Sequence, residues 1–116
     1  DRYAVFSLEE KNLNSLIAPQ LKSEFVFLRN EGVRNLIFDL GQVDYVDSSG
    51  LSAILTANRI WKDSGSFVMA NIQSDSVHKL IEISKLDGLL TIIPTIEAAV
   101  EYVYMEDLER DLTEEE

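Results

Sequence analysis

Apolar residues form two patterns that alternate along the chain. Short runs rich in β-branched and aromatic residues predict strands at "RYAVFSL" (2–8), "NLIFDLGQV" (35–43), "SFVMANI" (66–72) and "LTIIP" (90–94). After each run, apolar residues recur every three or four positions, which predicts a helix. This order predicts a single α/β domain with a central mixed, largely parallel β-sheet of about four to five strands and about four helices.

The first helix is predicted from Ala18 to Glu31. Pro19 fits its first turn, where a missing N–H costs nothing, and Gly32 is a natural stop. The apolar residues at helical spacing in and before this segment are Leu13, Leu16, Ile17, Leu21, Phe25 and Leu28. We expect three neighbours on it to be in the core: Phe25, Phe27 and Leu28.

The other helices also carry recognisable signals. The second follows "YVDSSGL" (45–51), ends at "KDSG" (62–65) and carries Trp61, expected to be an anchor in the core or at its boundary. Ser74 or Asp75 caps the third, which we expect Gly88 to end. The fourth begins near Ile96 and runs into an acidic segment.

The net charge of −11 is concentrated at one end of the chain. Residues 97–116 hold nine acidic residues and one basic residue, which leaves only −3 for the rest of the chain. We therefore expect a domain at residues 1–104 and a solvated acidic C-terminal extension at 105–116. In it, Leu108 and Leu112 could prolong the last helix, whereas "TEEE" is expected to fray.

The bulk composition excludes several classes of function. Without a basic stripe, direct binding to nucleic acid is disfavoured, because no row of cations is available to displace phosphate counterions. The chain has no cysteine, so it has neither disulfides nor thiolate metal sites. No apolar run approaches the roughly 20 residues of a membrane span and no signal peptide is visible, so we expect a cytoplasmic protein without membrane insertion.

The "DSSG" segment, Asp47 to Gly50, permits two interpretations. The side chains of Asp47, Ser48 and Ser49 can cap the following helix by accepting hydrogen bonds from its first N–H groups. The same helix end carries a partial positive charge that stabilises an added anion. A phosphoserine would bring about −1.5 to −2 charges to this position and could switch the docking of a partner.

Catalytic and metal-binding readings have weaker support. His78 is the only histidine, and it lies in the third helix pattern as a surface or boundary residue; the chain has no G-x-S-x-G or Gly-rich phosphate loop. Asp39, Asp44 and Asp47 could gather around one loop and hold a cation, but such acids are more often caps or turn residues. We therefore expect no enzyme activity, no cofactor and no metal.

Three segments together resemble one known family. These are "LIFDLGQVDYVDSSGLSAIL" (36–55), "LNSLIAPQL" (13–21) and "ISKLDGLLTIIPTIEAAVEYV" (83–103). They look like the signature strand–loop–helix, the entry to the first helix and the closing elements of the STAS domain family. Within that family the chain resembles the bacterial anti-sigma factor antagonists.

The resemblance implies a role for each residue of the motif. Ser48 would be phosphorylated by an anti-sigma factor that is also a serine kinase of the GHKL type, and a PP2C-type phosphatase would reset it. The unphosphorylated form would bind the kinase and so free a sigma factor. Asp47 would hold the loop, Ser49 and Gly50 would start the helix, and these residues with Leu51 and Asn14 would contact the partner.

STAS domains also suggest a different class of function. They serve as subunits or scaffolds of larger assemblies, such as anion transporters and lipid-transport complexes. In such an assembly, Ser48 would only cap its helix. Phosphorylation of Ser48 by a cognate kinase would distinguish the two hypotheses.

Overall fold

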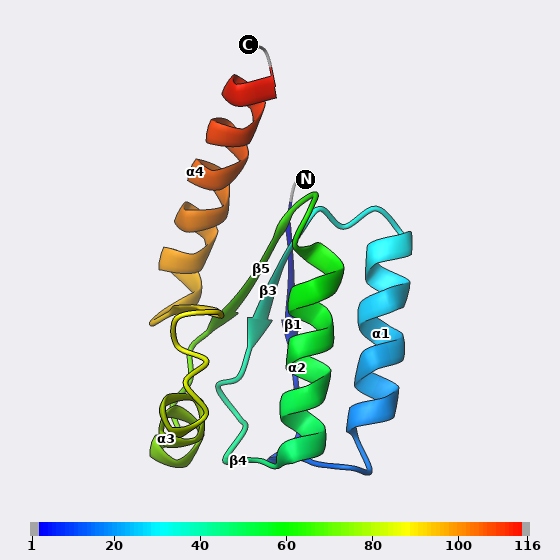
Figure 1. Ribbon diagram of the computed structural model, residues 1–116, viewed down its shortest axis with the longest axis vertical. Helices are drawn as coiled ribbons and strands as arrows, with labels where there is room; N and C mark the ends of the chain where they lie inside the picture. Colours follow the sequence, from blue (N-terminus) through cyan, green and yellow to red (C-terminus); the bar gives the residue numbers. More distant parts are fainter. Residues whose placement is uncertain (1–2, 115–116) are drawn as a thin grey trace.

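The computed structural model describes residues 3–114 (Figure 1). Along the chain lie β1 (Tyr3–Ser7), β2 (Asn12–Leu13), α1 (Ala18–Asn30), β3 (Asn35–Asp39), β4 (Tyr45–Val46), α2 (Ser48–Trp61), β5 (Ser66–Ala70), α3 (Asp75–Ile83), β6 (Thr91–Ile93) and α4 (Ile96–Glu114). The predicted α/β fold with four helices is confirmed.

Two parallel sheets organise these elements. The main sheet has four strands in the order β1-β3-β5-β6, and β2 pairs with β4 in a separate two-stranded sheet. All strand pairs formed within residues 3–114 are parallel. Parallel neighbours need a crossover connection, which explains why α1, α2 and α3 separate the main strands along the chain.

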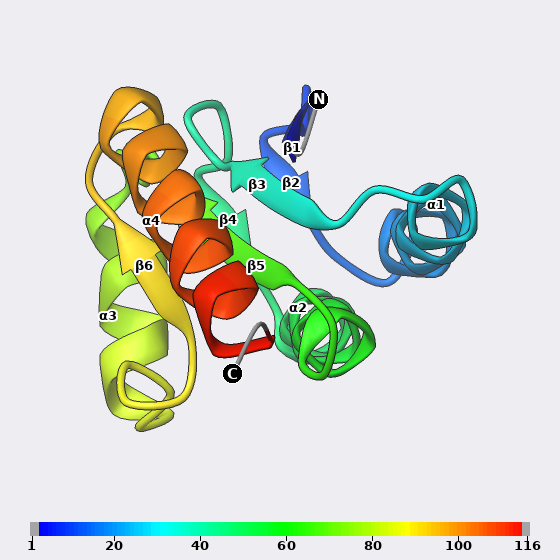
Figure 2. The ribbon, with the colours of Figure 1, turned by 90° about the horizontal axis from the view of Figure 1, so that it is seen from above.

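Helices cover both faces of the main sheet. Figure 2 shows α1 and α2 on one side and α4 on the other. Leu36 and Phe38 of β3 belong to the larger core with α1 and α2, whereas Ile37 packs in a second cluster with Ala99 and Val103 of α4. Burial on both faces explains why β3 is a continuous apolar run rather than an alternating one.

An aromatic cluster fills the larger core. Phe25 lies edge-on to Phe38 and Trp61, with ring centroids 5.4 and 6.1 Å apart. The indole Nε1 of Trp61 donates a hydrogen bond to the Val33 carbonyl at 2.9 Å, so the expected anchor is confirmed. Phe25 and the partly buried Leu28 contribute to the core as predicted, but Phe27 is 56% exposed and that prediction was wrong. Two residues along a helix correspond to a turn of about 200°, which directs Phe27 away from Phe25.

Most of the residues predicted to start or end a helix do so in the structure. Pro19 lies in the first turn of α1, Gly32 follows the helix with φ +94°, and Ser74 caps α3 by accepting from the Val77 N–H at 3.2 Å. Gly88, however, does not end α3. The helix stops at Ile83, and Lys85 takes the left-handed conformation with φ 58°.

The turn after α3 explains the earlier stop. The Leu86 N–H donates to the Ile81 carbonyl at 3.0 Å, and the Leu86 side chain packs against the larger core. This arrangement satisfies a free carbonyl at the helix end and buries an apolar residue, as in a Schellman-type turn.

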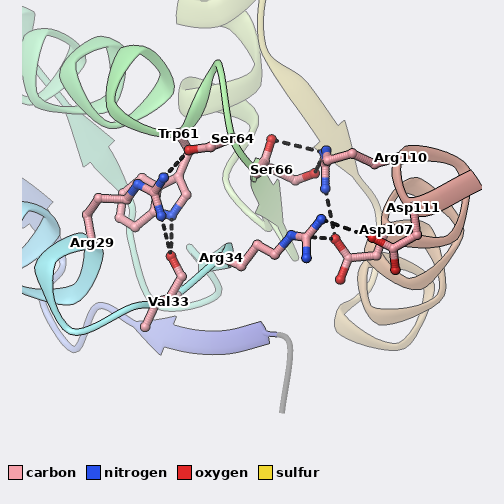
Figure 3. A network of polar contacts seen from close by, with 10 residues as sticks. Arg29, Val33, Arg34, Trp61, Ser64, Ser66, Asp107, Arg110 and Asp111 are labelled. Carbon is pink, nitrogen blue, oxygen red and sulfur yellow. Dashed lines mark hydrogen bonds and ion pairs between the residues drawn. The ribbon is translucent and has the colours of Figure 1, made fainter. Parts of the chain in front are cut away.

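The acidic segment is helical as far as it is described. α4 continues unbroken to Glu114, and Asp107 is only 2% exposed, so the expectation of a solvated tail was wrong for this residue. Its carboxylate lies between the Arg34 and Arg110 guanidinium groups (Figure 3). Leu108 and Leu112 do prolong the helix, while residues 1–2 and 115–116, including part of "TEEE", lie outside the described residues.

Within residues 3–114, no helix combines the length and apolar character needed to cross a bilayer.

Candidate functional site

The DSSG segment forms the start of α2. Asp47 is the N-cap, with an extended backbone, and its Oδ1 accepts a hydrogen bond from the Gly50 N–H at 3.0 Å. Ser48 and Ser49 follow as the first two helical residues. Asp47 therefore caps α2, and the two serine hydroxyls are not needed as caps.

Ser48 has the more accessible hydroxyl of the pair. Its side chain is exposed, whereas Ser49 is half-buried. Within the described part of the chain, the Ser48 hydroxyl makes no hydrogen bond. It lies in the first turn of a helix of 14 residues, where unpaired N–H groups and the helix dipole create a positive potential. The position thus combines access from solvent with an environment that tolerates an added negative charge.

Gly50 allows α2 to approach the small β2–β4 sheet. A Cβ atom at this position would lie 2.4 Å from the Leu13 carbonyl oxygen and 2.7 Å from the Leu13 Cγ. The same carbonyl oxygen accepts a hydrogen bond from the Asp47 N–H at 3.1 Å. Glycine is therefore required by close packing, and it fixes the loop that carries Ser48 against β2.

The segment after β2 lies beside this helix start. Asn14 Oδ1 accepts from the Leu16 N–H at 3.0 Å, and the Asn14 carbonyl accepts from the Ala18 N–H at 2.8 Å. Asn14 thus shapes the entry to α1 and leaves Leu16 projecting, with 83% of its surface exposed. The Leu16 side chain is therefore outside the core and accessible from solvent.

A shallow hollow separates the starts of α1 and α2, which lie at the same end of the molecule (Figure 1). Its volume is about 440 Å³, and Lys22 on one wall donates a hydrogen bond from Nζ to Ser52 Oγ at 3.3 Å. The residues that line the hollow are Ser15, Ala18, Pro19, Lys22, Ser48, Ser49 and Ser52. Four of these seven residues are serines, and the hollow is open to solvent.

The sequence placed six residues at the candidate site, and the structure brings them into one region. Asp47, Ser48, Ser49, Gly50 and Leu51 are consecutive at the start of α2, and Asn14 follows β2, which pairs with β4 directly before them. Leu51 is only partly exposed and packs against the larger core. Sequence reasoning missed Leu16 and Lys22 as members of this surface. Leu16 lies just outside α1, at a position that helical spacing alone would have placed in the core.

Asp39 has a structural environment rather than a catalytic one. Its carboxylate accepts hydrogen bonds from Ser7 Oγ at 2.7 Å, the Gly41 N–H at 2.9 Å and Asn71 Nδ2 at 3.1 Å. Burial raises the pKa of Asp39, but these three hydrogen bonds outweigh it, and the net pKa lies below its ordinary value. The group ties the ends of β1, β3 and β5 together as a carboxylate.

The other candidate polar groups are also dispersed. Asp44 receives the Ser74 hydroxyl on its backbone carbonyl at 2.8 Å, and Asp47 caps α2. Among the described residues, no three side chains of metal-ligating type gather into a site. His78 is an exposed helix residue, as predicted, and its Nε2 lies 3.1 Å from the Ile72 carbonyl.

Comparison with known proteins identifies the family. The model of the STAS domain matches residues 3–99, and the chain therefore belongs to the STAS domain family. A relative from Bordetella bronchiseptica, named "Putative anti-sigma factor antagonist BtrV", is 34% identical over 83 residues, which cover 71% of this chain and 68% of the relative.

Solved structures have a similar fold. The crystal structure of a putative anti-sigma factor antagonist from Thermotoga maritima is similar with a TM-score of 0.76 and 26% identity, over 86% of this chain and 87% of that one. The anti-sigma factor antagonist SpoIIAA in its unphosphorylated form has a TM-score of 0.74 at 22% identity, over 89% of each chain. SpoIIAA, a Bacillus cell fate determinant, is also similar in its phosphorylated form, with a TM-score of 0.65 at 21% identity, over 88% of this chain and 91% of that one.

Proposed function

We propose that this chain is an anti-sigma factor antagonist whose partner binding is controlled by phosphorylation of Ser48. The observation that carries the proposal is the exposed, unbonded hydroxyl of Ser48 at the start of α2, inside the part of the chain that matches the STAS domain. SpoIIAA, with the same fold, has been captured with and without phosphate.

The partner in this proposal is an anti-sigma factor that is also a GHKL-type serine kinase. Its docking surface would include Ser48, Leu16 and the segment shaped by Asn14. Leu16 offers an exposed apolar anchor next to Ser15, which lines the same hollow as Ser48, the combination expected of an interface in which an apolar contact is surrounded by polar groups. The kinase supplies ATP and the base for phosphoryl transfer, so this chain contributes only an accessible hydroxyl.

Phosphate on Ser48 would weaken docking by local electrostatics. A dianion at the protruding helix start would lose solvation in an interface adapted to a neutral hydroxyl. Within the chain, the N–H groups at the start of α2 favour the added charge, so the fold does not need to rearrange. A PP2C-type phosphatase would restore the binding form.

The same proposal covers the extent and location of the domain. We assign the phosphorylation-controlled STAS domain to residues 1–104 and residues 105–116 to an acidic C-terminal extension. Release of a sigma factor would take place in the bacterial cytoplasm, where the kinase, the phosphatase and RNA polymerase are found.

The deciding experiment is a phosphorylation assay. The protein is incubated with ATP and each GHKL-type kinase encoded by the same genome, and the phosphosite is located by mass spectrometry. We expect one phosphate on Ser48, lost in Ser48→Ala and retained in the matched control Ser49→Ala. Labelling that survives Ser48→Ala would contradict the proposal. Absence of labelling, together with stable co-purification with transporter or lipid-transport subunits, would favour the scaffold function instead.

A binding measurement tests the switch itself. Binding is measured with the nucleotide-bound kinase under conditions in which it does not transfer phosphate. Ser48→Asp should lower the affinity for this kinase at least tenfold, which is about 1.4 kcal/mol. Leu16→Ala should weaken the same complex without changing the stability of the free protein, because Leu16 is outside the core. Equal affinities for wild type and Ser48→Asp would rule out electrostatic control.

A further inference from the structure

The outer face of the C-terminal half of α4 is apolar. Tyr104, Met105, Leu108 and Leu112 are each more than half exposed, and we call them the α4 stripe. Tyr104, Leu108 and Leu112 are spaced four residues apart, and Met105 is three residues from Leu108, so the four side chains share one side of the helix. The stripe is about 12 Å long.

The opposite face of the same turns is fastened to the domain. Asp107 Oδ1 lies 3.3 Å from Arg34 Nε and 2.8 Å from Arg110 Nη1. Arg110 Nη2 also donates to the Gly65 carbonyl at 3.2 Å, so the network joins α4 to the segments before β3 and β5 (Figure 3). The helix is therefore held in place with Met105, Leu108 and Leu112 directed away from the sheet, while the Tyr104 ring packs edge-on against Tyr3 of β1, with ring centroids 5.8 Å apart. No folding is needed to form this surface.

Acidic side chains border the stripe. Glu101 lies about one turn before it, and Glu109 lies along one flank, both exposed. In the part of the chain that the structure describes, neither of these two carboxylates forms an ion pair. Arg34 and Arg110 are both engaged by Asp107 on the inner side of α4. The rim of the stripe is therefore negative and has no intramolecular cation to neutralise it.

We propose that the α4 stripe docks an amphipathic helix whose apolar face is bordered by lysine and arginine. Apolar contact supplies the attraction, and the acidic rim selects a cationic partner. A second copy of this chain is a poorer occupant because it would bring two acidic rims together. About two helical turns cover the stripe, so the contact is small and its dissociation constant is expected in the micromolar range.

This surface is separate from the proposed phosphorylation site. Ser48 lies at the start of α2, and the C-terminal end of α4 lies at the other end of the long axis of the molecule (Figure 1). Binding at the α4 stripe would therefore leave the Ser48 surface accessible. The two proposals stand on different residues and can fail independently.

Peptide binding tests the inference. A synthetic helix of about 18 residues, with leucines on one face and lysine or arginine on both flanks, is titrated into the full chain by calorimetry. We expect saturable binding that weakens several-fold between about 50 and 500 mM NaCl, because salt screens the charged rim. A peptide with the same leucines but glutamate flanks should bind at least tenfold more weakly. Equal binding of the two peptides, or no binding of the basic one, would overturn the proposal.

Variants locate the contact. Leu108→Ser combined with Leu112→Ser should weaken the basic peptide at least tenfold, since the exposed parts of two leucines would no longer be buried. Phe27→Ser, at an exposed apolar residue on α1, is the matched control and should bind as wild type does. Ser48→Asp should also be unchanged. Binding that survives in the double variant would refute the assigned location, and a dimer of wild type that the double variant abolishes would show that a second copy occupies the stripe.

Discussion

Replacement of Gly50 by alanine is the sharpest test of how the site is built. On helix propensity alone, Gly50→Ala should stabilise α2 by up to about 1 kcal/mol. The added methyl group, however, would be 2.4 Å from the Leu13 carbonyl oxygen and 3.0 Å from Val46 Cγ1. The first of these is a backbone atom, which cannot rotate away, so either β2 or the start of α2 has to shift.

The expected cost follows from this geometry. Overpacking of a tight interior site costs about 1–3 kcal/mol. Displacing the Leu13 carbonyl also weakens its 3.1 Å hydrogen bond from the Asp47 N–H, worth about 1 kcal/mol. After subtraction of the gain in helix propensity, we expect Gly50→Ala to lower the free energy of unfolding by about 2 kcal/mol. With a urea m-value of about 1.3 kcal/mol/M, the unfolding midpoint should fall by about 1.5 M.

Urea denaturation followed by circular dichroism measures the effect. Gly88→Ala is the matched control, because a Cβ atom at Gly88 meets nothing within 4 Å and that glycine does not have positive φ. The control should lie within about 0.5 kcal/mol of wild type. If Gly50→Ala unfolds at the same urea concentration as Gly88→Ala, close packing of α2 against β2 is not the reason for glycine in the motif.

Three further predictions concern carboxylates. Asp47→Ala should lose about 1 kcal/mol with its N-cap, seen as a fall of about 4 °C in Tm, whereas Asp47→Asn should lose less than half of that; equal losses would contradict capping. Asp107→Asn should cost about 2 kcal/mol in urea denaturation, because two guanidinium groups lose their shared buried counter-charge, and Asp111→Asn, at a more exposed carboxylate, should cost less than about 1 kcal/mol; the reverse order would refute a stabilising role for the ion pairs of Asp107. The lowered folded-state pKa of Asp39 contributes stability that is complete above about pH 4 and is lost as pH falls through that pKa, so wild type should lose stability more steeply below about pH 4 than Asp39→Asn; parallel pH curves would exclude this contribution.

Sequence patterns predicted the elements whose signals are local. The uninterrupted apolar run of β3, the proline in α1 and the Asp-Ser-Ser start of α2 each have a short-range physical cause, and each was located correctly. The two-residue strands β2 and β4 were missed because two residues are too few to show a period. Their pairing depends on the close approach that Gly50 permits, which is a property of the folded chain.

Tertiary contacts explain the remaining differences between the structure and the predictions from sequence. Asp107 lies in a run of acids that is typical of a solvated segment, and only the approach of Arg34, far away in the sequence, makes its burial favourable. A left-handed residue that ends a helix is usually a glycine, so the sequence favoured Gly88 as the end of α3. In the structure Lys85 takes this conformation instead, because the resulting turn buries Leu86 against the larger core. For the site, the sequence located the motif, but the exposure of Leu16 became apparent only from the loop that Asn14 shapes.

The order of strands in the main sheet has a consequence for synthesis of the chain. Because β1, β3, β5 and β6 are neighbours in the order in which they are translated, each strand can add to an edge that already exists. The face formed by Ile37 and Val68 is covered by Ala99 and Val103 of α4, a helix that follows all four of these strands along the chain. Until α4 emerges from the ribosome, the nascent sheet is apolar on one exposed side, and a ribosome stalled before Ile96 should release a product that aggregates rather than a shortened but functional domain.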